Sequence, residues 1–217
     1  LDVLAYNTHV NALTANFALN ESFLGTAQLR SSVVSLATGI GYVPDTKTSA
    51  KATVGVTLNL SGVSGRPSTV DLPRYHRFAA TVDDVAYVFQ TTEVHTAEDD
   101  GNGSYVFKTV DGSAVVPIYE GTRKAKTFLV GEFNEADVYM IPDISLDADS
   151  ALVTVTEGTT DTVFTNITAA TTISATSTIY ILKEAPNGFY QLSFGGNGIL
   201  GLSPAAGSTI TVDYIST

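Results

Sequence analysis

The run from Ser177 to Gly207 (STIYILKEAPNGFYQLSFGGNGILGLSPAAG) constrains the fold more than any other part of the sequence. Apolar residues alternate at period two on both sides of a Pro-Asn-Gly step, which predicts two strands joined by a tight turn. The residues expected on the apolar faces are Ile179 and Ile181, then Tyr190, Leu192 and Phe194. A corner rich in glycine, which allows backbone conformations closed to residues with a Cβ, follows at Gly195, Gly196, Gly198 and Gly201. A proline-marked turn then leads into a last strand.

Residues 1–37 form the only region with a convincing helical period. Apolar residues recur at the spacing of one helix face, and the pattern resumes after a break near Gly25. Thr26 is positioned to cap the second helix, Gly39 or Gly41 to end it, and Pro44 to force extended or turn geometry. A short amphipathic helix must bury its apolar face, either on the chain's own sheet or against helices of neighbouring chains. The residues of this candidate protein interface are Tyr6, Val10, Leu13 and Phe17, then Leu29, Val33 and Leu36.

From Ala52 the period changes to two and continues to Leu60, which predicts a half-buried strand. A hairpin follows, with strands at residues 78–82 and 85–89 around Asp83-Asp84. Further turn signals fall at residues 99–103, ahead of Tyr105 and Phe107, and at Asp111-Gly112. Turns at this spacing indicate antiparallel sheets rather than βαβ units. The fold class is therefore α+β and mostly β: a helical segment (1–43) followed by β-rich domains at 44–134 and 135–217.

The segment from Val153 to Thr178 is rich in threonine and valine, a composition that fits either a flexible stalk or strands. Strands are favoured because β-branched residues suit a sheet. The expected anchors are Val153, Val155, Val163, Ile167 and Ile173. A polar run from Gly131 to Asp137 marks a plausible boundary between two sets of strands.

Composition excludes several classes of function. Apolar residues make up 44% of the 217 residues and charged ones 15%, which indicates a core-forming chain. The net charge of −11 argues against a general nucleic-acid binder. Cysteine is absent, so disulfides and thiolate chemistry are excluded. No apolar run approaches the length of about 18 residues that spans a bilayer. Because the chain opens at Leu1, inside a helical pattern, we expect a piece of a larger protein.

No motif in the sequence indicates catalysis or a metal site. His9, His76 and His95 lack the spacing of a zinc site, and no G-x-S-x-G elbow or phosphate loop occurs. The acidic run at residues 98–103 departs from the register of a calcium loop and is interpreted as a hairpin turn. The basic run at residues 123–126 suits a solvated turn between strands, with a patch for an acidic partner as the alternative. The sequence therefore predicts no catalytic residue and no cofactor.

Four segments, taken in order, resemble the baseplate wedge proteins of contractile-tailed phages. The N-terminal LAYNTHVN stretch with its Gly41, Tyr42 and Pro44 exit is similar to the family's helical opening. Residues 119–121 and 128–130 resemble a strand pair of that family, and residues 139–155 (YMIPDISLDADSALVTV) its middle motif. The run at 177–207 resembles its S-x-x-Y-x-x-x-E…G-x-Y-x-x-x-F-G-D-G pattern. It departs by having Phe194-Gly195-Gly196-Asn197-Gly198, and Asp143 stands where the family often has Asn.

This resemblance implies a structural virion protein, a fragment of a wedge subunit in the tail baseplate that is assembled in the host cytoplasm. It also implies that the partners are other copies of the chain and other wedge proteins, joined through shared helices into a ring. Nucleic acid, membrane and small-molecule substrates are not expected. The alternative is a β-rich carbohydrate-binding or receptor-binding tail module, although such sites usually display exposed aromatics and this chain has no Trp. An enzyme has no constellation of residues to support it.

Overall fold

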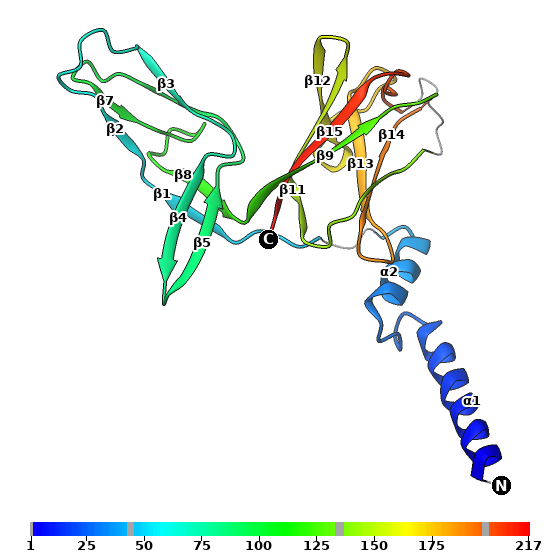
Figure 1. Ribbon diagram of the computed structural model, residues 1–217. Coiled ribbons are helices and arrows are strands. Elements are labelled where there is room, and N and C mark those ends of the chain that lie inside the picture. The colour runs from blue at the N-terminus through cyan, green and yellow to red at the C-terminus, as the bar shows by residue number, and fades with distance from the viewer. Residues whose placement is uncertain (1, 43–45, 133–136, 197–199) are drawn as a thin grey trace. The chain divides into compact units, whose positions relative to one another are not determined.

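The computed structural model describes residues 2–42, 46–132, 137–196 and 200–217 (Figure 1). The sequence predictions for Leu1, Pro44, Asn197 and Gly198, and for most of the polar run before Asp137, lie outside these ranges. Two helices come first, and the rest of the described chain is mainly strand. The helical elements are α1 (Asp2–Glu21), α2 (Arg30–Gly39) and the 3-10 turn η1 (Ile167–Ala169). The strands are β1 (Lys51–Val54), β2 (Thr57–Asn59), β3 (Thr69–Leu72), β4 (Arg77–Val82), β5 (Val85–Gln90), β6 (His95–Glu98), β7 (Ser104–Val106), β8 (Val116–Glu120), β9 (Thr122–Leu129), β10 (Tyr139–Ile141), β11 (Leu146–Glu157), β12 (Thr160–Asn166), β13 (Ile179–Glu184), β14 (Tyr190–Phe194) and β15 (Thr209–Ser216).

The predicted fold class is confirmed. A four-stranded sheet has the order β1-β8-β5-β4, and a seven-stranded sheet has the order β10-β14-β13-β12-β11-β15-β9. Two further pairs join β2 to β7 and β3 to β6. Pairing is mostly antiparallel, but β12 and β13 run parallel, with Thr165 opposite Ile179.

The chain forms two compact units. Unit 1 comprises residues 1–46, 128–144 and 153–210, and unit 2 comprises residues 47–127, 145–152 and 211–217. Strands β9, β11 and β15 each contribute residues to both units. The core of unit 2 is a cluster of buried residues from four strands and their neighbours: Leu72, Ala97, Tyr105, Phe107, Val116 and Ile118.

The predicted hairpin in unit 2 is confirmed. Strands β4 and β5 pair from Arg77 opposite Gln90 to Val82 opposite Val85. Asp83 and Asp84 form the two-residue turn with φ of 50° and 62°, which are left-handed values at both central positions. This is the type I′ geometry that matches the twist of the strands, and Asp tolerates it better than most residues.

The predicted strand from Ala52 to Leu60 is broken. Strand β1 ends at Val54 and pairs with β8, whereas β2 begins at Thr57 and pairs with β7. Gly55 and Val56 lie between the two strands, and Phe107 donates its backbone N–H to the carbonyl of Val56. The alternating pattern therefore continues across a point where the chain passes from one sheet to another.

The β13–β14 hairpin of unit 1 is present, but one of its predicted faces is only partly confirmed. Tyr190, Leu192 and Phe194 are buried on β14, as expected. Their partners across the ladder are Glu184, Leu182 and Tyr180, which are buried too. Of the two residues predicted for the apolar face of β13, Ile179 is buried as expected and Ile181 is only partly buried. Burying an acidic residue conflicts with an apolar-face pattern, and only the partner of Glu184, described below, explains it.

The glycine-rich corner depends on Gly195. A Cβ built on Gly195 would lie 1.4 Å from the backbone oxygen of Leu200. The Ser203 hydroxyl donates to the Gly195 carbonyl at 2.8 Å, which holds the two sides of the corner together. The predicted need for glycine at this position therefore arises from a close backbone approach.

The strands predicted between Val153 and Thr178 are confirmed only for the first half of that segment. Val153 and Val155 are buried on β11, and β12 ends at Asn166. Residues 170–178 are not in strands. Val163 and Ile173, expected as anchors, are exposed, and Phe164 is the buried residue of β12. Phe164 contacts Phe194 edge-on at 5.2 Å between ring centroids, and this contact selects the buried face.

Candidate assembly surface

Helix α1 exposes its apolar residues. It spans 20 residues, and none of them is buried. Four of the predicted interface residues lie on it, with exposed fractions of 71% for Tyr6, 37% for Val10, 63% for Leu13 and 45% for Phe17. The chain's own sheet therefore does not cover the stripe of apolar residues that the sequence pattern predicts.

The spacing of these residues is that of a coiled-coil seam. Tyr6, Val10, Leu13 and Phe17 are separated by four, three and four residues, and Val3 extends the series by three more towards the N-terminus. Val3 is 82% exposed. Sequence reasoning missed Val3, although continuing the alternation of three and four backwards would have found it. We call Val3, Tyr6, Val10, Leu13 and Phe17 the α1 stripe.

The composition of α1 gives it little stability on its own. Four asparagines and two threonines, all poor helix formers, lie between Asp2 and Glu21. The side chains of Thr8 and Thr14 donate back to the carbonyls of Leu4 and Val10, at 2.9 and 2.8 Å. Such bonds compete weakly with helical structure and add no tertiary contact. An isolated helix of this composition is marginal in water, so packing must supply most of its stability.

Glu21 organises the connection between α1 and α2. Its carboxylate accepts the backbone N–H groups of Gln28 at 2.8 Å and Leu29 at 3.2 Å. The hydrogen bond from the Ser32 side chain, followed by that from the Gln28 N–H, holds the pKa of Glu21 below its usual value. The predicted capping by Thr26 is wrong, since the Thr26 hydroxyl donates to the carbonyl of Asn20 and α2 begins only at Arg30. The Glu21 carboxylate binds the two backbone N–H groups just before α2 rather than capping its first turn.

Helix α2 packs on unit 1 through Val34 and Ala37, which are its buried residues. The predicted Val33 and Leu36 flank them and are half-buried, while Leu29 precedes the helix and is 48% exposed. Gly41 follows α2 with φ of +84° and donates its N–H to the carbonyl of Thr38. The predicted glycine-assisted end of the helix is therefore confirmed.

An ion pair with one buried partner, Glu184, fixes the start of α2. Arg30 Nε donates to Oε1 of Glu184 at 3.0 Å, and Nη2 donates to Oε2 at 2.6 Å. The Glu184 side chain is 4% exposed and that of Arg30 is 66% exposed. The guanidinium thus satisfies a carboxylate that water barely reaches, which explains why β13 tolerates an acidic residue on its buried face.

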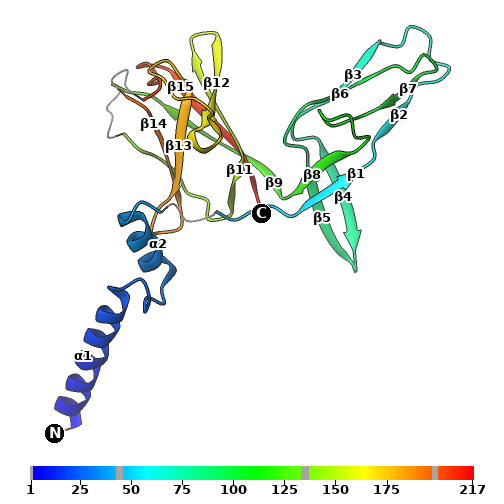
Figure 2. The same ribbon diagram turned by 180° about the vertical axis from the view of Figure 1, so that it is seen from behind.

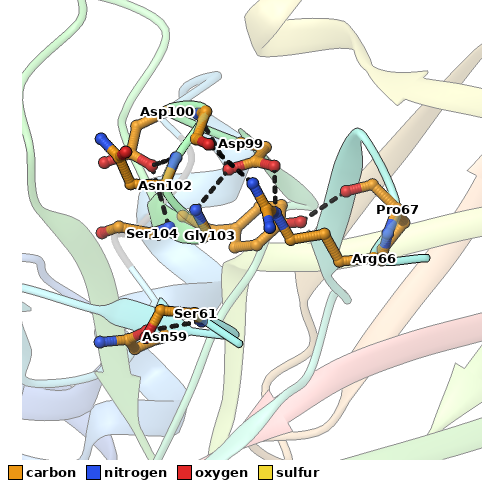
Figure 3. Close-up of polar contacts among 11 residues, drawn as sticks. Asn59, Ser61, Arg66, Pro67, Asp99, Asp100, Asn102, Gly103 and Ser104 are labelled. Carbon is orange, nitrogen blue, oxygen red and sulfur yellow. Dashed lines mark hydrogen bonds and ion pairs between the residues drawn. The ribbon is translucent and has the colours of Figure 1, made fainter. Parts of the chain in front are cut away.

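The acidic run is a turn, as predicted (Figure 3). Asp99 Oδ1 accepts the N–H groups of Gly101 and Gly103 at 3.0 and 2.8 Å. Asp100 Oδ1 likewise accepts those of Asn102 and Ser104, at 2.7 and 3.0 Å. The guanidinium of Arg66, which pairs with Asp99 at 2.5 Å, and then the Gly103 N–H hold the pKa of Asp99 below its usual value. These carboxylates are engaged by backbone donors, as expected of turn residues.

The basic run is part of a strand, not the predicted solvated turn. Residues 123–126 lie inside β9. Arg123 donates through Nε and Nη2 to Oδ1 of Asp213, at 2.8 and 2.6 Å. Its guanidinium also lies 4.9 Å from the centroid of the Tyr75 ring. Arg123 therefore serves contacts within unit 2.

The three histidines are dispersed: His9 is exposed on α1, His76 is exposed ahead of β4, and His95 is buried on β6. Within the described ranges, no three His, Asp or Glu side chains gather as metal ligands would. None of the helices in those ranges combines the length and hydropathy needed to cross a membrane.

Two comparisons show which proteins this chain is similar to. Residues 1–42 match the family described as "Baseplate wedge protein gp6-like, helical domain". Over an alignment of 237 residues that covers the whole chain, the sequence is 31% identical to baseplate wedge protein gp6 of Enterobacteria phage T4. The chain spans 33% of the length of that relative. It is thus a relative of phage baseplate wedge proteins, and both the resemblance predicted from the motifs and the location in the virion tail baseplate are confirmed.

Proposed function

We propose that this chain is a structural segment of a baseplate wedge protein, and that α1 joins it to other copies of itself and to other wedge proteins. One observation carries the proposal: the α1 stripe is exposed, and no residue of the helix is buried. Helices of neighbouring chains with the same spacing would cover the stripe by packing knobs into holes.

The difference in burial between the two helices supports this proposal. Helix α2 is held on unit 1 by Val34, Ala37 and the Arg30–Glu184 pair. Helix α1 is linked to α2 through Glu21 but makes no comparable burial of its own. We infer that α2 anchors the segment and leaves α1 for contact with neighbours. The remaining β structure acts as a rigid spacer in a baseplate ring, with no catalytic role and no small-molecule substrate.

The carbohydrate-binding alternative receives less support. The exposed aromatic residues among the described ranges are Tyr6, Phe17, Phe23, Tyr42 and Tyr87. Four of them lie in the helical segment, and no flat sheet face gathers them as a sugar platform would. A glycan array tests this alternative directly, and specific binding that survives removal of residues 1–42 would revive it.

The structure suggests a deletion that separates assembly from folding. Removing residues 1–20 takes away α1 and retains Glu21, Arg30 and the contacts of α2. We expect the shortened chain to keep the thermal midpoint of the full chain but to sediment as a monomer where the full chain forms oligomers. Equal self-association of the two chains, measured by sedimentation equilibrium at matched concentrations, would refute the role of α1.

A further inference from the structure

Strand β4 is an open sheet edge that carries none of the usual protection. It is the last strand in the order β1-β8-β5-β4 and, among the described strands, pairs only with β5 (Figure 1). Its register with β5 runs one to one over six residues, without a bulge. Its sequence, RFAATV, contains no proline and no lysine, and its single charge is at the first residue. Natural edge strands normally carry such features because a bare edge pairs with other chains.

One face of the hairpin is apolar along its full length. Phe78 and Phe89 pair across the ladder and pack against the core of unit 2. Further towards the turn the same face carries Ala80 opposite Tyr87 and Val82 opposite Val85. Here the exposed fractions are 57% for Val82, 51% for Val85 and 39% for Tyr87. Figure 2 shows the turn of this hairpin lying well away from the other strands of the four-stranded sheet.

The turn geometry decides which backbone groups are free. In a two-residue hairpin the closing pair, Val82 and Val85, exchanges hydrogen bonds, and such pairs alternate along the ladder. Ala80 and Phe78 therefore direct their backbone groups towards β5. Arg77, Ala79 and Thr81 direct theirs outwards, to the open edge. An added antiparallel strand must bond to these three residues, which restricts the possible registers.

We propose that β4 pairs antiparallel with β4 of a second copy of this chain, with Ala80 opposite Ala80 on the two-fold axis. This register joins outward-facing residues, Ala79 with Thr81 of the second copy and the reverse. It also sets Arg77 of each copy opposite Asp83 of the other, so opposite charges close both ends of the pairing. Phe78 then lies beside Val82 of the second copy, and the apolar faces of the two hairpins become continuous.

Charge complementarity is the reason for choosing a second copy as the occupant. The strand presents one positive end, Arg77, and one negative end, the Asp83-Asp84 turn, separated by five uncharged residues. An antiparallel copy of the same strand matches this distribution at both ends. This pairing is independent of α1, so the chain would have two separate self-contacts, of which the two-fold β4 contact joins copies in pairs.

The absence of cysteine makes a site-specific cross-linking test possible in the full chain. Directly opposite residues that do not exchange hydrogen bonds have Cα atoms about 4.5 Å apart, within the range that a disulfide bridges. Ala80→Cys should therefore form disulfide-linked dimers under mild oxidation. Thr81→Cys, one residue along and also exposed, should link about tenfold more slowly because its opposite residue is Ala79. Equal linking of both variants, or none by Ala80→Cys, would overturn the proposal.

Two further variants in the Ala80→Cys background test the hydrogen bonds and the charges. Ala79→Pro removes an outward N–H and leaves the ladder to β5 intact, so linking should slow by about tenfold, whereas Ala79→Thr should leave it unchanged. Arg77→Glu should slow linking by about two- to fivefold at low salt and less at high salt. Unchanged linking in Ala79→Pro that retains the wild-type circular dichroism spectrum would show that β4 is not the contact. If the Ala80→Cys chain formed disulfides with another polypeptide in preference to its own copy, that result would likewise contradict self-pairing.

Discussion

Arg30 and Glu184, which are 154 residues apart in the sequence, form a two-point ion pair between the first turn of α2 and the buried face of β13. The carboxylate is almost inaccessible and the guanidinium is largely exposed. Because water can reach only one partner, the two residues differ in what their removal leaves behind: loss of Arg30 leaves a buried charge, and loss of Glu184 leaves a solvated one.

We therefore predict that Arg30→Met destabilises the chain by about 1–3 kcal/mol, because it leaves the Glu184 carboxylate unpaired in unit 1. Adding Glu184→Leu to Arg30→Met should recover part of this loss, since the unpaired charge is then gone. Urea denaturation of the wild type, the two single variants and the double variant gives the coupling energy. Additive effects would show that the pair does not hold α2 in place.

Gly195 should be intolerant of any side chain. Gly195→Ala places a Cβ within bonding distance of the Leu200 carbonyl oxygen, so the corner must open, and we expect a loss of about 3 kcal/mol or more. Gly131→Ala is the matched control, because a Cβ there meets nothing within 4 Å. Thermal denaturation of the two variants compares them, and a midpoint for Gly195→Ala close to that of Gly131→Ala would contradict the predicted clash.

The Tyr75 ring links the loop before β4 to β9. It lies under two guanidinium groups, 5.1 Å from Arg74 and 4.9 Å from Arg123, and its own φ of 62° is left-handed. Tyr75→Leu keeps the apolar bulk but loses both cation–π contacts, so we expect a cost of about 1–2 kcal/mol. Tyr75→Phe should cost less than about 1 kcal/mol, because the hydroxyl contact with the Ser150 carbonyl is long, at 3.5 Å. Similar chemical-denaturation midpoints for the two variants would exclude the stacking role.

The low pKa of Asp99 predicts acid sensitivity of the turn in Figure 3. Arg66, and then the Gly103 and Gly101 N–H groups, favour the ionised form in the folded chain. The contribution of ionised Asp99 to the stability of the folded chain is therefore complete above the ordinary pKa of about 4. It is lost as the pH falls through the lower pKa of the folded state. The urea midpoint of Asp99→Asn should therefore fall less steeply than that of the wild type as the pH drops below about 4. A decline as steep as that of the wild type would assign the acid sensitivity to other carboxyl groups.

Sequence patterns predicted features that depend on local chemistry. The Asp83-Asp84 turn, the glycine-assisted end of α2 and the Pro-Asn-Gly turn each need only a few neighbouring residues, and each is confirmed. The apolar stripe of α1 is also predicted by the sequence, because it depends on the spacing of residues alone. Whether the chain itself or another copy covers that stripe was left open by the sequence.

The errors arose where distant residues decide the outcome. On β13 the predicted Ile179 is buried, but Glu184 is buried more fully than the predicted Ile181, because its partner is Arg30, far away in the sequence. Val163 is predicted as an anchor because β-branched residues favour strands, yet Phe164, in contact with Phe194, is the buried residue of β12. Thr26 has the chemistry of a cap, but its hydroxyl donates to the Asn20 carbonyl and α2 begins only at Arg30. The domain boundaries expected at residues 44 and 135 remain a prediction.

The central claim is that the α1 stripe, and not merely the presence of α1, holds copies of this chain together. Leu13 and Leu19 offer a matched pair, since both are leucines on the same helix and are 63% and 59% exposed. At about 100° per residue, Leu13 lies within the stripe and Leu19 about 160° from its centre. Sedimentation velocity of Leu13→Asp and Leu19→Asp at matched concentrations tests the claim most directly. Oligomers lost in Leu13→Asp and retained in Leu19→Asp are the predicted result, and equal behaviour of the two variants would contradict it.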